Sequence, residues 1–442
     1  NPEKKKTSDS SAENARPQVQ CLELATGTAM TIDAVRTFSV PKESGRWLAC
    51  LLDSPPGPKA IKSVSQSRET FGVTGEGLEQ KSKPVKLKSR AALARERGEL
   101  KAESSQEKSG QPTKKATASG AKAVGKESGS SSSEAEKKDK QPGNPLLLID
   151  LHTGIRRTYP NVTSYRFSRN GSHVAFITSV PKGSTKTTGK SANLVDGVYL
   201  IKLDNFSQST LLEGLGQYRG LTFSSDGAKI AFLGNRDDYQ AKTPSWSIFL
   251  ASTKKTAANK IASETTDGIP SGWWVAPQSG LQFSDDMARL YFDTAPISEK
   301  VLEERKSSGS KKSSTEEEKK GKAKLDLWHW KDPQLQPQQL LRAQSERTRT
   351  YQAAYVFDGS RVVQLETRLM PSVGIDYRSK SRIAVANTNL PYQKSLSWDV
   401  PGFQDVVLVN LDTGMRQKVA ERVKWSAALS PEGNYITWFD AE

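Results

Sequence analysis

The chain has 442 residues, a formal net charge of +16 and a hydrophobic content of 35%. No run approaches the roughly 18 consecutive apolar residues that a membrane-spanning helix requires, so the sequence predicts no such span. The hydrophobic content is low because Lys-, Ser- and Gly-rich stretches dilute it, and the remainder has enough apolar residues for a core. The length exceeds one ordinary domain, but radial repeat folds reach it as a single unit.

The N-terminal segment, residues 1–18, is predicted to be disordered. Residues 1–15 are polar and charged, lack an initiator Met and contain no apolar stretch of signal-peptide length, so nothing there directs secretion. The missing Met and the end at Glu442, directly after a predicted hairpin, indicate a fragment of a longer polypeptide.

The first strand-rich unit, Val19–Pro55, contains both cysteines of the chain. Cys21 and Cys50 have strand-like surroundings, which favours two small buried residues. A bridge between neighbouring strands is the alternative. Two cysteines in a chain of this length define no redox compartment.

A strand–turn–strand pattern recurs along the chain. In VTSYRFSRNGSHVAFITS, which starts at Val162, Tyr165 and Phe167 alternate with polar residues, and Asn170-Gly171 supplies a tight turn before a second apolar run. The same form returns in LTFSSDGAKIAFL from Leu221, LQFSDDMARLYFD from Leu281, ALSPEGNYITWFD from Ala428 and, more loosely, AAYVFDGSRVVQL from Ala353.

A second kind of hairpin precedes each copy of this inner hairpin. The clearest examples are LLLIDLHTGIRRTY, VVLVNLDTGMRQKV and CLELATGTAMTI, and weaker ones are VYLIKLDNFSQSTLL, SIFLASTKKTAANKI and LDLWHWKDPQLQPQQL. Two hairpins make a four-stranded antiparallel sheet, and such sheets repeated at roughly 40 to 60 residues indicate propeller blades.

The sequence therefore predicts an all-β fold, a β-propeller of six or more four-stranded antiparallel units, not all of them necessarily complete. The predicted units are Val19–Pro55, Pro145–Val180, Val198–Asp238, Trp246–Pro296, Leu325–Thr367 and a last region from Ser372 onward, in which residues 372–387 are a degenerate inner hairpin.

Two low-complexity insertions, residues 56–144 and 300–324, interrupt a propeller domain that spans residues 19–442. Both are predicted to be disordered, apart from a short helix at Ser89–Leu100. The first holds 19 Lys and Arg against 11 Asp and Glu, so its surplus of 8 is half of the net charge. Binding to nucleic acid or to an anionic surface is one interpretation. A solvated loop is the other, and the lack of interleaved aromatics favours it, so no nucleic-acid partner is predicted.

The sequence offers almost no candidate for catalysis. Its three histidines, His152, His173 and His329, lie near no nucleophile motif and no second ligand at metal-binding spacing, so each is interpreted as structural. A G-x-S-x-G elbow, a P-loop and a dinucleotide fingerprint are absent. We assign no catalytic, cofactor-binding or metal-binding residue and expect no cofactor.

The acidic pairs Asp237-Asp238 and Asp285-Asp286 are interpreted as turn residues that accept hydrogen bonds from the local backbone. The tryptophans are expected to pack in the core and between blades, and a ligand platform inside the channel is the alternative. We place Trp47 and Trp438 in inner hairpins, Trp328 and Trp330 in an outer strand, and Trp273-Trp274 after a bend.

Four longer strings carry a resemblance to a known family. They are NVTSYRFSRNGSHVAFITS, GQYRGLTFSSDGAKIAFLGNRDDY, AKLDLWHWKDPQLQPQQ and SWDVPGFQDVVLVNLDTG. Together they resemble the N-terminal propeller of bacterial serine peptidases of the prolyl oligopeptidase family, over most of residues 19–442 outside the insertions. In that family an α/β-hydrolase domain with a Ser-Asp-His triad follows the propeller, which admits short peptides only.

The resemblance implies that this chain is the substrate-gating portion of such a peptidase, with the catalytic domain downstream of Glu442 and no peptidase activity of its own. The implied partners are a peptide substrate in the propeller channel and that hydrolase domain. Members of the family are frequently exported, which favours an extracytoplasmic location. The alternatives are a non-catalytic propeller that binds proteins and a binder of nucleic acid or anionic surfaces.

Overall fold

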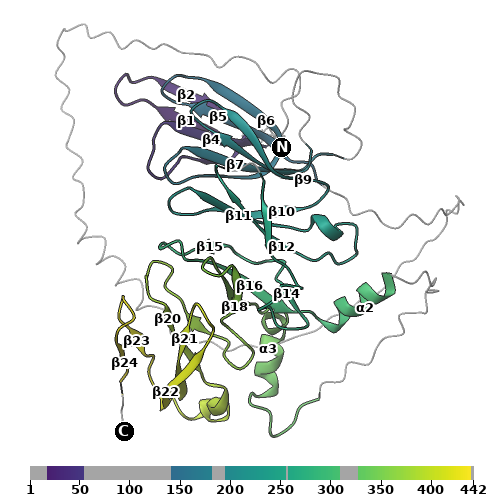
Figure 1. Ribbon diagram of the computed structural model, residues 1–442, viewed down its shortest axis with the longest axis vertical. Coiled ribbons are helices and arrows are strands. Elements are labelled where there is room, and N and C mark those ends of the chain that lie inside the picture. Colours follow the sequence, from purple (N-terminus) through teal and green to yellow (C-terminus); the bar gives the residue numbers. More distant parts are fainter. Residues whose placement is uncertain (1–16, 54–140, 182–194, 255–256, 309–326, 440–442) are drawn as a thin grey trace, which may run out of the picture. The chain divides into compact units, whose positions relative to one another are not determined.

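The computed structural model describes residues 17–53, 141–181, 195–254, 257–308 and 327–439. Over these residues the chain is a β-propeller built from antiparallel sheets (Figure 1). The helices of the described residues lie in connections between strands. The predicted all-β propeller class is confirmed. Among the described residues, no helix has the length and apolar character needed to cross a membrane.

The first two blades share one long strand, β6 (Arg156–Phe167). Its first half pairs with β5 and its second half with β7. Val162 pairs with both strands, directly after Asn161, which has a φ of 58°. Blade 1 contains β3 (Val35–Ser39), β4 (Trp47–Leu52), β5 (Asn144–Asp150) and the first half of β6. Blade 2 contains the second half of β6, β7 (His173–Thr178), β8 (Gly197–Lys202) and β9 (Ser207–Glu213).

Three more blades follow in chain order. Blade 3 contains β10 (Tyr218–Phe223), β11 (Lys229–Gly234), β12 (Ser247–Ser252) and β13 (Asn259–Ala262). Blade 4 contains β14 (Trp273–Val275) and β15 (Gln282–Phe283), which both pair with β16 (Arg289–Pro296), then β17 (Tyr351–Val356) and β18 (Arg361–Gln364). Blade 5 contains β19 (Val373–Gly374), β20 (Ile383–Thr388), β21 (Gln404–Asn410) and β22 (Arg416–Val423).

Two separate hairpins complete the described strands. They are β1 (Val19–Leu22) with β2 (Ala29–Ile32), and β23 (Ala428–Leu429) with β24 (Ile436–Thr437). The described part of the chain thus holds a seven-stranded sheet that forms blades 1 and 2, sheets of four, five and four strands for blades 3 to 5, and two two-stranded hairpins. The number of six or more units stays a prediction. The degenerate inner hairpin expected at residues 372–387 is present as β19–β20.

The predicted order of the two hairpins within a blade is wrong. The sequence patterns place the outer hairpin first, but in the structure the inner hairpin leads, as in blade 3, where β10–β11 precedes β12–β13. The predicted unit Val198–Asp238 therefore joins the outer half of blade 2 to the inner half of blade 3. Each hairpin is encoded locally, whereas the pairing of β11 with β12 spans a longer connection that leaves no local pattern.

The prediction that Leu325–Thr367 forms a separate unit is also wrong, because its strands belong to blade 4. AAYVFDGSRVVQL forms β17–β18, the outer hairpin of blade 4, and not an inner hairpin. Trp328 and Trp330 lie in an exposed coil before helix α3 (Gln336–Arg347), and not in an outer strand. Pro337 at the start of this helix fixes a helical φ and donates no backbone hydrogen bond, which suits a first turn and excludes a central strand.

A buried serine closes the inner hairpins of blades 2, 3 and 4. Ser168, Ser224 and Ser284 are at most 1% exposed, and in each case the backbone N–H five residues later donates to the serine Oγ at 2.8–2.9 Å. Ser430 accepts the equivalent bond from Tyr435 at 3.0 Å. The serine of the repeated FS or LS pair is therefore a structural part of the turn, because its hydroxyl satisfies a backbone donor where the strand pairing starts.

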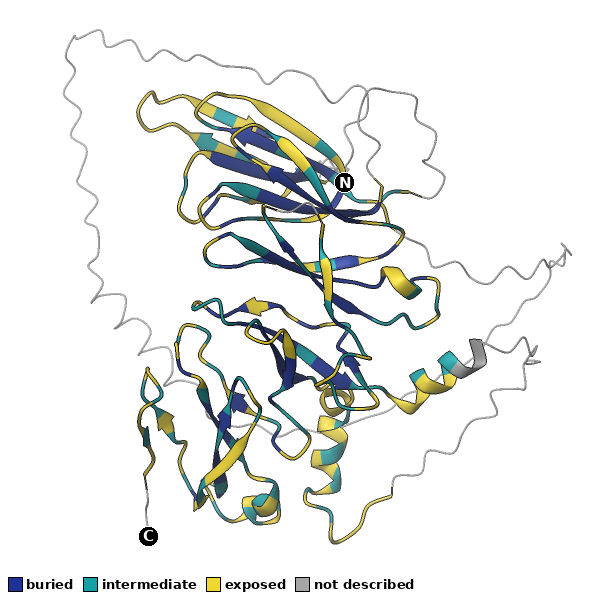
Figure 2. Ribbon diagram, viewed as in Figure 1, coloured by how far each residue is buried: buried dark blue, intermediate teal, exposed yellow. Residues whose placement is uncertain are grey.

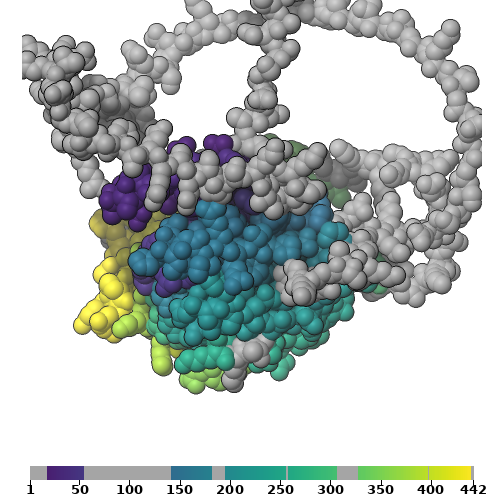
Figure 3. Space-filling model, turned by 90° about the horizontal axis from the view of Figure 1, so that it is seen from above, coloured from purple at the N-terminus to yellow at the C-terminus, as the bar shows by residue number. Residues whose placement is uncertain are grey.

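The core lies between consecutive blades. Phe232 on β11 packs with Ile177 and Leu200 of blade 2, whereas the next residue, Leu233, packs with Leu290 of blade 4. Both faces of the second strand in a blade are therefore covered, which explains its continuous apolar run (Figure 2). Blades 4 and 5 share a third cluster. In the space-filling view of Figure 3, the blue atoms of the stretch that begins at residue 141 lie directly beside the teal atoms of the stretch that follows it in the sequence.

All long connections join the second strand of a blade to the third, so they leave corresponding ends of the sheets. Among the described residues, three of these connections hold helices: η1 (Arg236–Asp238) in blade 3, α2 (Glu299–Ser308) and α3 in blade 4, and η2 (Leu390–Ser397) in blade 5.

Helix α2 covers the first part of the predicted insertion 300–324. Arg305 on α2 forms an ion pair with Glu264 at 2.8 Å and lies 5.2 Å from the ring of Trp274. The prediction of disorder is therefore wrong for residues 300–308. The rest of both insertions lies outside the described residues, except for residues 141–144, and so do the predicted helix at residues 89–100 and most of the N-terminal segment.

Replacing residues 56–140 with a short Gly-Ser linker is expected to change the free energy of unfolding by less than about 1 kcal/mol. The insertion joins β4 to β5, which pair directly with Leu51 opposite Leu146, so a short loop can connect them. Urea unfolding of the two proteins measures the difference. A loss of several kcal/mol would show that the insertion packs against the blades.

Candidate functional site: a basic pocket on the inner strands

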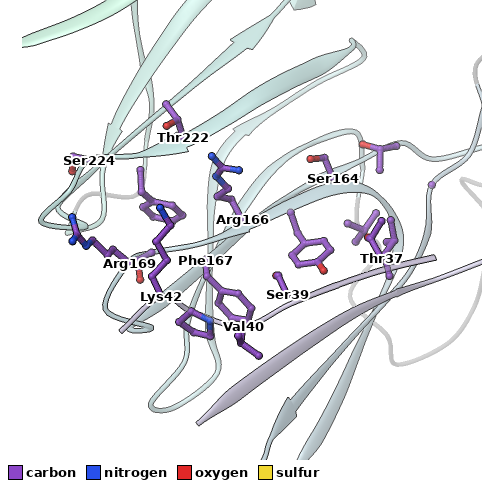
Figure 4. A pocket seen from close by; sticks show the side chains of 18 of the residues that line it. Thr37, Ser39, Val40, Lys42, Ser164, Arg166, Phe167, Arg169, Thr222 and Ser224 are labelled. Atoms are coloured by element: carbon purple, nitrogen blue, oxygen red, sulfur yellow. The ribbon is translucent and has the colours of Figure 1, made fainter. Parts of the chain in front are cut away.

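A pocket lies on the first strands of blades 1 to 4. Its volume is about 960 Å³, and residues of β3, β6, β10 and β15 and of their turns line it. Figure 4 shows part of this lining, with Lys42 and Arg169 toward one end and Thr37 toward the other. Successive blades thus present their first strands to one common space, which is how a propeller forms its channel.

The lining carries an excess of positive charge. Arg36, Lys42, Arg166 and Arg169 contribute four cations, whereas Asp285 is the one acidic residue of the described lining. All four cations are exposed: Arg36 and Arg166 lie on β3 and β6, and Lys42 and Arg169 lie in the turns that follow these strands.

Aromatic residues beneath these cations hold the inner strands in place. The Tyr165 hydroxyl donates to the carbonyl of Ala49 at 3.1 Å, which ties β6 to β4. The rings of Tyr165 and Phe167 meet edge to face at 6.5 Å. Burial raises the pKa of Tyr165 above its usual value, so this phenol stays protonated and serves as a hydrogen-bond donor.

The three histidines lie outside this lining. His173 is on β7, where Nδ1 lies 2.8 Å from Ser172 Oγ, and burial lowers its pKa. His152 follows β5 and donates its backbone N–H to Asp150. His329 precedes α3, and its ring lies 5.6 Å from that of Trp330 in a tilted arrangement. No group of three or more His, Cys, Asp or Glu in the described parts of the chain is placed to hold a metal ion.

The acidic pairs behave largely as turn residues. Asp286 accepts the backbone N–H of Ala288 at 3.0 Å, and Asp238 accepts that of Ser245 at 2.7 Å. Asp237 instead forms an ion pair with Lys260 at 2.9 Å, which lowers its pKa. Asp285 belongs to the pocket lining, a placement that the sequence pattern does not reveal.

The cysteines are unpaired. Cys50 is fully buried on β4, where burial raises its pKa to about 11, and Cys21 is half-buried on β1. The interpretation as small buried residues holds for Cys50 and in part for Cys21. A thiol with a raised pKa is a poor nucleophile.

The pocket is therefore suited to binding. Serines such as Ser39, Ser164 and Ser225 line it, but no histidine of the described chain accompanies them to act as a base. Its polar groups are hydroxyls, amides and cations, which recognise ligands through hydrogen bonds and charge. Arg36, Lys42 and Arg166 were not predicted from the sequence. For Arg166 the signal is its polar position between Tyr165 and Phe167 on β6, whereas Lys42 lies in the turn after β3, where no strand pattern marks it.

No protein-family model and no curated protein matches the chain. Among solved structures it is similar to TolB from Acinetobacter baumannii, at 11% identity and a TM-score of 0.25, over 68% of this chain and 54% of that one. It is also similar to dipeptidyl peptidase 4 from Porphyromonas gingivalis, at 12% identity and a TM-score of 0.31, over 66% of this chain and 38% of that one. A third match is the acylaminoacyl peptidase of Pyrococcus horikoshii, at 16% identity and a TM-score of 0.28, over 62% of this chain and 36% of that one.

The chain thus spans about a third to a half of the length of these three proteins. Two of them are peptidases and one is TolB. All identities are below 25% and all TM-scores are below 0.5, so the assignment as a propeller rests on the strand pairing and packing of this chain.

Proposed function

We propose that this chain is the substrate-gating propeller of a serine peptidase that acts on short peptides, with the Ser-Asp-His domain downstream of Glu442 in the same polypeptide. The pocket on the inner strands is the observation that carries the proposal. Its volume of about 960 Å³ lies in the range of binding sites for small ligands and is too small for a folded protein. Its lining has groups for binding a peptide and no histidine for cleaving one.

Exposed apolar side chains on two neighbouring long connections support a covering domain. Trp328, Trp330 and Leu341 belong to the connection of blade 4, and Trp398 belongs to that of blade 5; they are 66%, 76%, 85% and 76% exposed. The two connections meet, because Lys394 Nζ lies 6.0 Å from the Trp330 ring. Several exposed aromatic residues on one end of a propeller are typical of an interaction surface. We propose that the hydrolase domain covers this surface.

The same surface supports the alternative function, a non-catalytic propeller that binds another protein. The sequence downstream of Glu442 distinguishes the two functions. A G-x-S-x-G elbow between a strand and a helix, and then an Asp and a His further along, would favour the peptidase.

The isolated chain is expected to show no turnover of fluorogenic peptides, whereas the complete polypeptide cleaves short peptides and leaves folded proteins intact. A peptidase of this class needs a serine, a base and an orienting acid within hydrogen-bond reach. Cleavage of a peptide series of increasing length by both proteins measures this.

Two results would contradict the proposal. Turnover by the isolated chain that a serine-directed covalent inhibitor abolishes would place the active site within these residues. Equal cleavage of short peptides and folded proteins by the complete polypeptide would remove the filter role.

A further inference from the structure

The geometry points to a preference for peptides that carry negative charge. This inference rests on the proposed function, because it names the substrates that the pocket would admit. The pocket combines three features: a volume large enough for a peptide segment, a lining with four cations and one acidic residue, and the lack of a partner for three of these cations among the described residues.

The cations of the pocket are available to a ligand. Arg36, Lys42 and Arg166 form no ion pair and no side-chain hydrogen bond among the described residues, and all three are exposed. Arg169 has a partner, since its Nε lies 2.6 Å from Glu43 Oε1, but both side chains are half-exposed. A pair that water reaches so freely contributes little and is easily exchanged for a ligand carboxylate.

The contrast with other arginines strengthens this point. Arg46, Arg289 and Arg305 each contact a carboxylate at 2.7–2.8 Å. Arg36 and Arg166 have no such contact within the described chain. Their positive charges repel one another in the shared pocket, and no carboxylate of the described chain offsets this repulsion through an ion pair. Such a site concentrates its field and attracts anions, and a guanidinium can bind a carboxylate through two parallel hydrogen bonds.

The neighbouring groups suit a peptide with acidic side chains. Ser39 and Ser164 and the amide of Gln282 can bond to a peptide backbone, and Phe167 and Phe223 offer apolar contact. Carboxylates of the peptide, either side chains or the C-terminus, would meet Arg36 and Arg166. We therefore infer that acidic peptides bind more tightly than neutral or basic ones.

The test measures fluorescence anisotropy of three labelled peptides of equal length, rich in Glu, Gln or Lys, with the chain of 442 residues. We expect the Glu-rich peptide to bind at least about tenfold more tightly than the Gln-rich one, which corresponds to about 1.4 kcal/mol. This advantage should shrink as salt rises. The double variant Arg36→Glu, Arg166→Glu should lose it.

The matched control is Arg342→Glu, Arg347→Glu. Both arginines are exposed on α3, outside the pocket lining and without a side-chain partner among the described residues, so the variant makes the same change in net charge. It should keep the preference. Thermal unfolding compares the folding of the two variants, and the comparison of three peptides on the unaltered chain needs no variant at all.

The outcomes separate this inference from the proposed function. Equal binding of the Glu-rich and Gln-rich peptides would overturn the charge preference and leave the peptide filter intact. Binding of none of the peptides would overturn both. An anisotropy change with a single-stranded oligonucleotide but with no peptide, lost in the pocket variant, would reassign the pocket to nucleic acid.

Discussion

Replacing Arg289 with Gln is expected to lower the free energy of unfolding by about 3–5 kcal/mol, the usual cost of removing one partner of a buried ion pair. Arg289 on β16 is 1% exposed, and its Nη2 lies 2.7 Å from Asp412 Oδ1. Its Nε donates to the same oxygen at 2.8 Å, and Asp286 lies 3.7 Å from Nη1. The substitution would remove the buried cation from two partly buried carboxylates and leave Asp412 with only the exposed Arg382.

This ion pair connects blade 4 to blade 5, since Asp412 lies in the turn after β21. Loss of the ion pair should therefore weaken the packing of blade 4 against blade 5, and the effect should extend beyond the turn that holds Asp412. Urea unfolding measures the free energy, and hydrogen exchange of β20 and β21 shows whether blade 5 opens first.

Arg382→Gln is the matched control. Arg382 contacts the same carboxylate, with Nε 3.6 Å from Asp412 Oδ2, but its side chain is 78% exposed. Exposed pairs contribute about 0–1 kcal/mol, so the expected loss is small. Similar losses in the two variants would mean that burial does not decide the strength of this pair.

The fold class was predictable because its unit is local. Residues such as Asn170-Gly171 and Asp226-Gly227 fix tight turns, and the apolar runs beside them form the strands. Asp226 accepts the backbone N–H of Ala228 at 2.9 Å, the turn role expected of acidic residues here. Each hairpin therefore carries its own signal over about a dozen residues.

The grouping of hairpins into blades was not predictable in the same way. The pairing of β16 with β17 crosses the connection that holds α2 and α3, and the composition of that connection says nothing about which strands it joins. The third copy also lacks a glycine in its turn, where Met287 adopts a φ of 62°, so the repeat is less regular than its spacing suggests.

The pocket was only partly predictable. A propeller implies a channel, but its charge depends on which alternate residues face inward. Arg36 and Arg166 lie on strands of two different blades, 130 positions apart in the sequence, and only the fold brings them to one pocket. Half of the net charge is in residues 56–144, so the composition of the chain does not point to Arg36 and Arg166.

Asp150→Asn is expected to lower the free energy of unfolding by about 1–3 kcal/mol at pH 7, because hydrogen bonds to a charged group are lost. Asp150 ends β5 with its side chain 2% exposed. It accepts Arg46 Nε at 3.1 Å and Nη2 at 2.8 Å, and the backbone N–H of His152 at 3.0 Å. These bonds, above all the one from the Arg46 guanidinium, hold the pKa of Asp150 well below its usual range.

The sign of the pH dependence follows from this lowered pKa. In the unfolded chain the carboxyl titrates near about 3.9, whereas in the folded protein it stays ionised to lower pH. Its contribution is therefore fully present above about pH 5 and is lost as the pH falls below about 4 toward the folded pKa. Urea unfolding of the unaltered protein and of Asp150→Asn between pH 3 and pH 7 should show a difference that is largest at pH 7 and shrinks with acid. Asp204→Asn, at an exposed carboxylate 3.9 Å from Lys202, should show almost no difference at any pH. A difference for Asp150→Asn that stays constant down to pH 3 would mean that the charge of Asp150 does not stabilise blade 1.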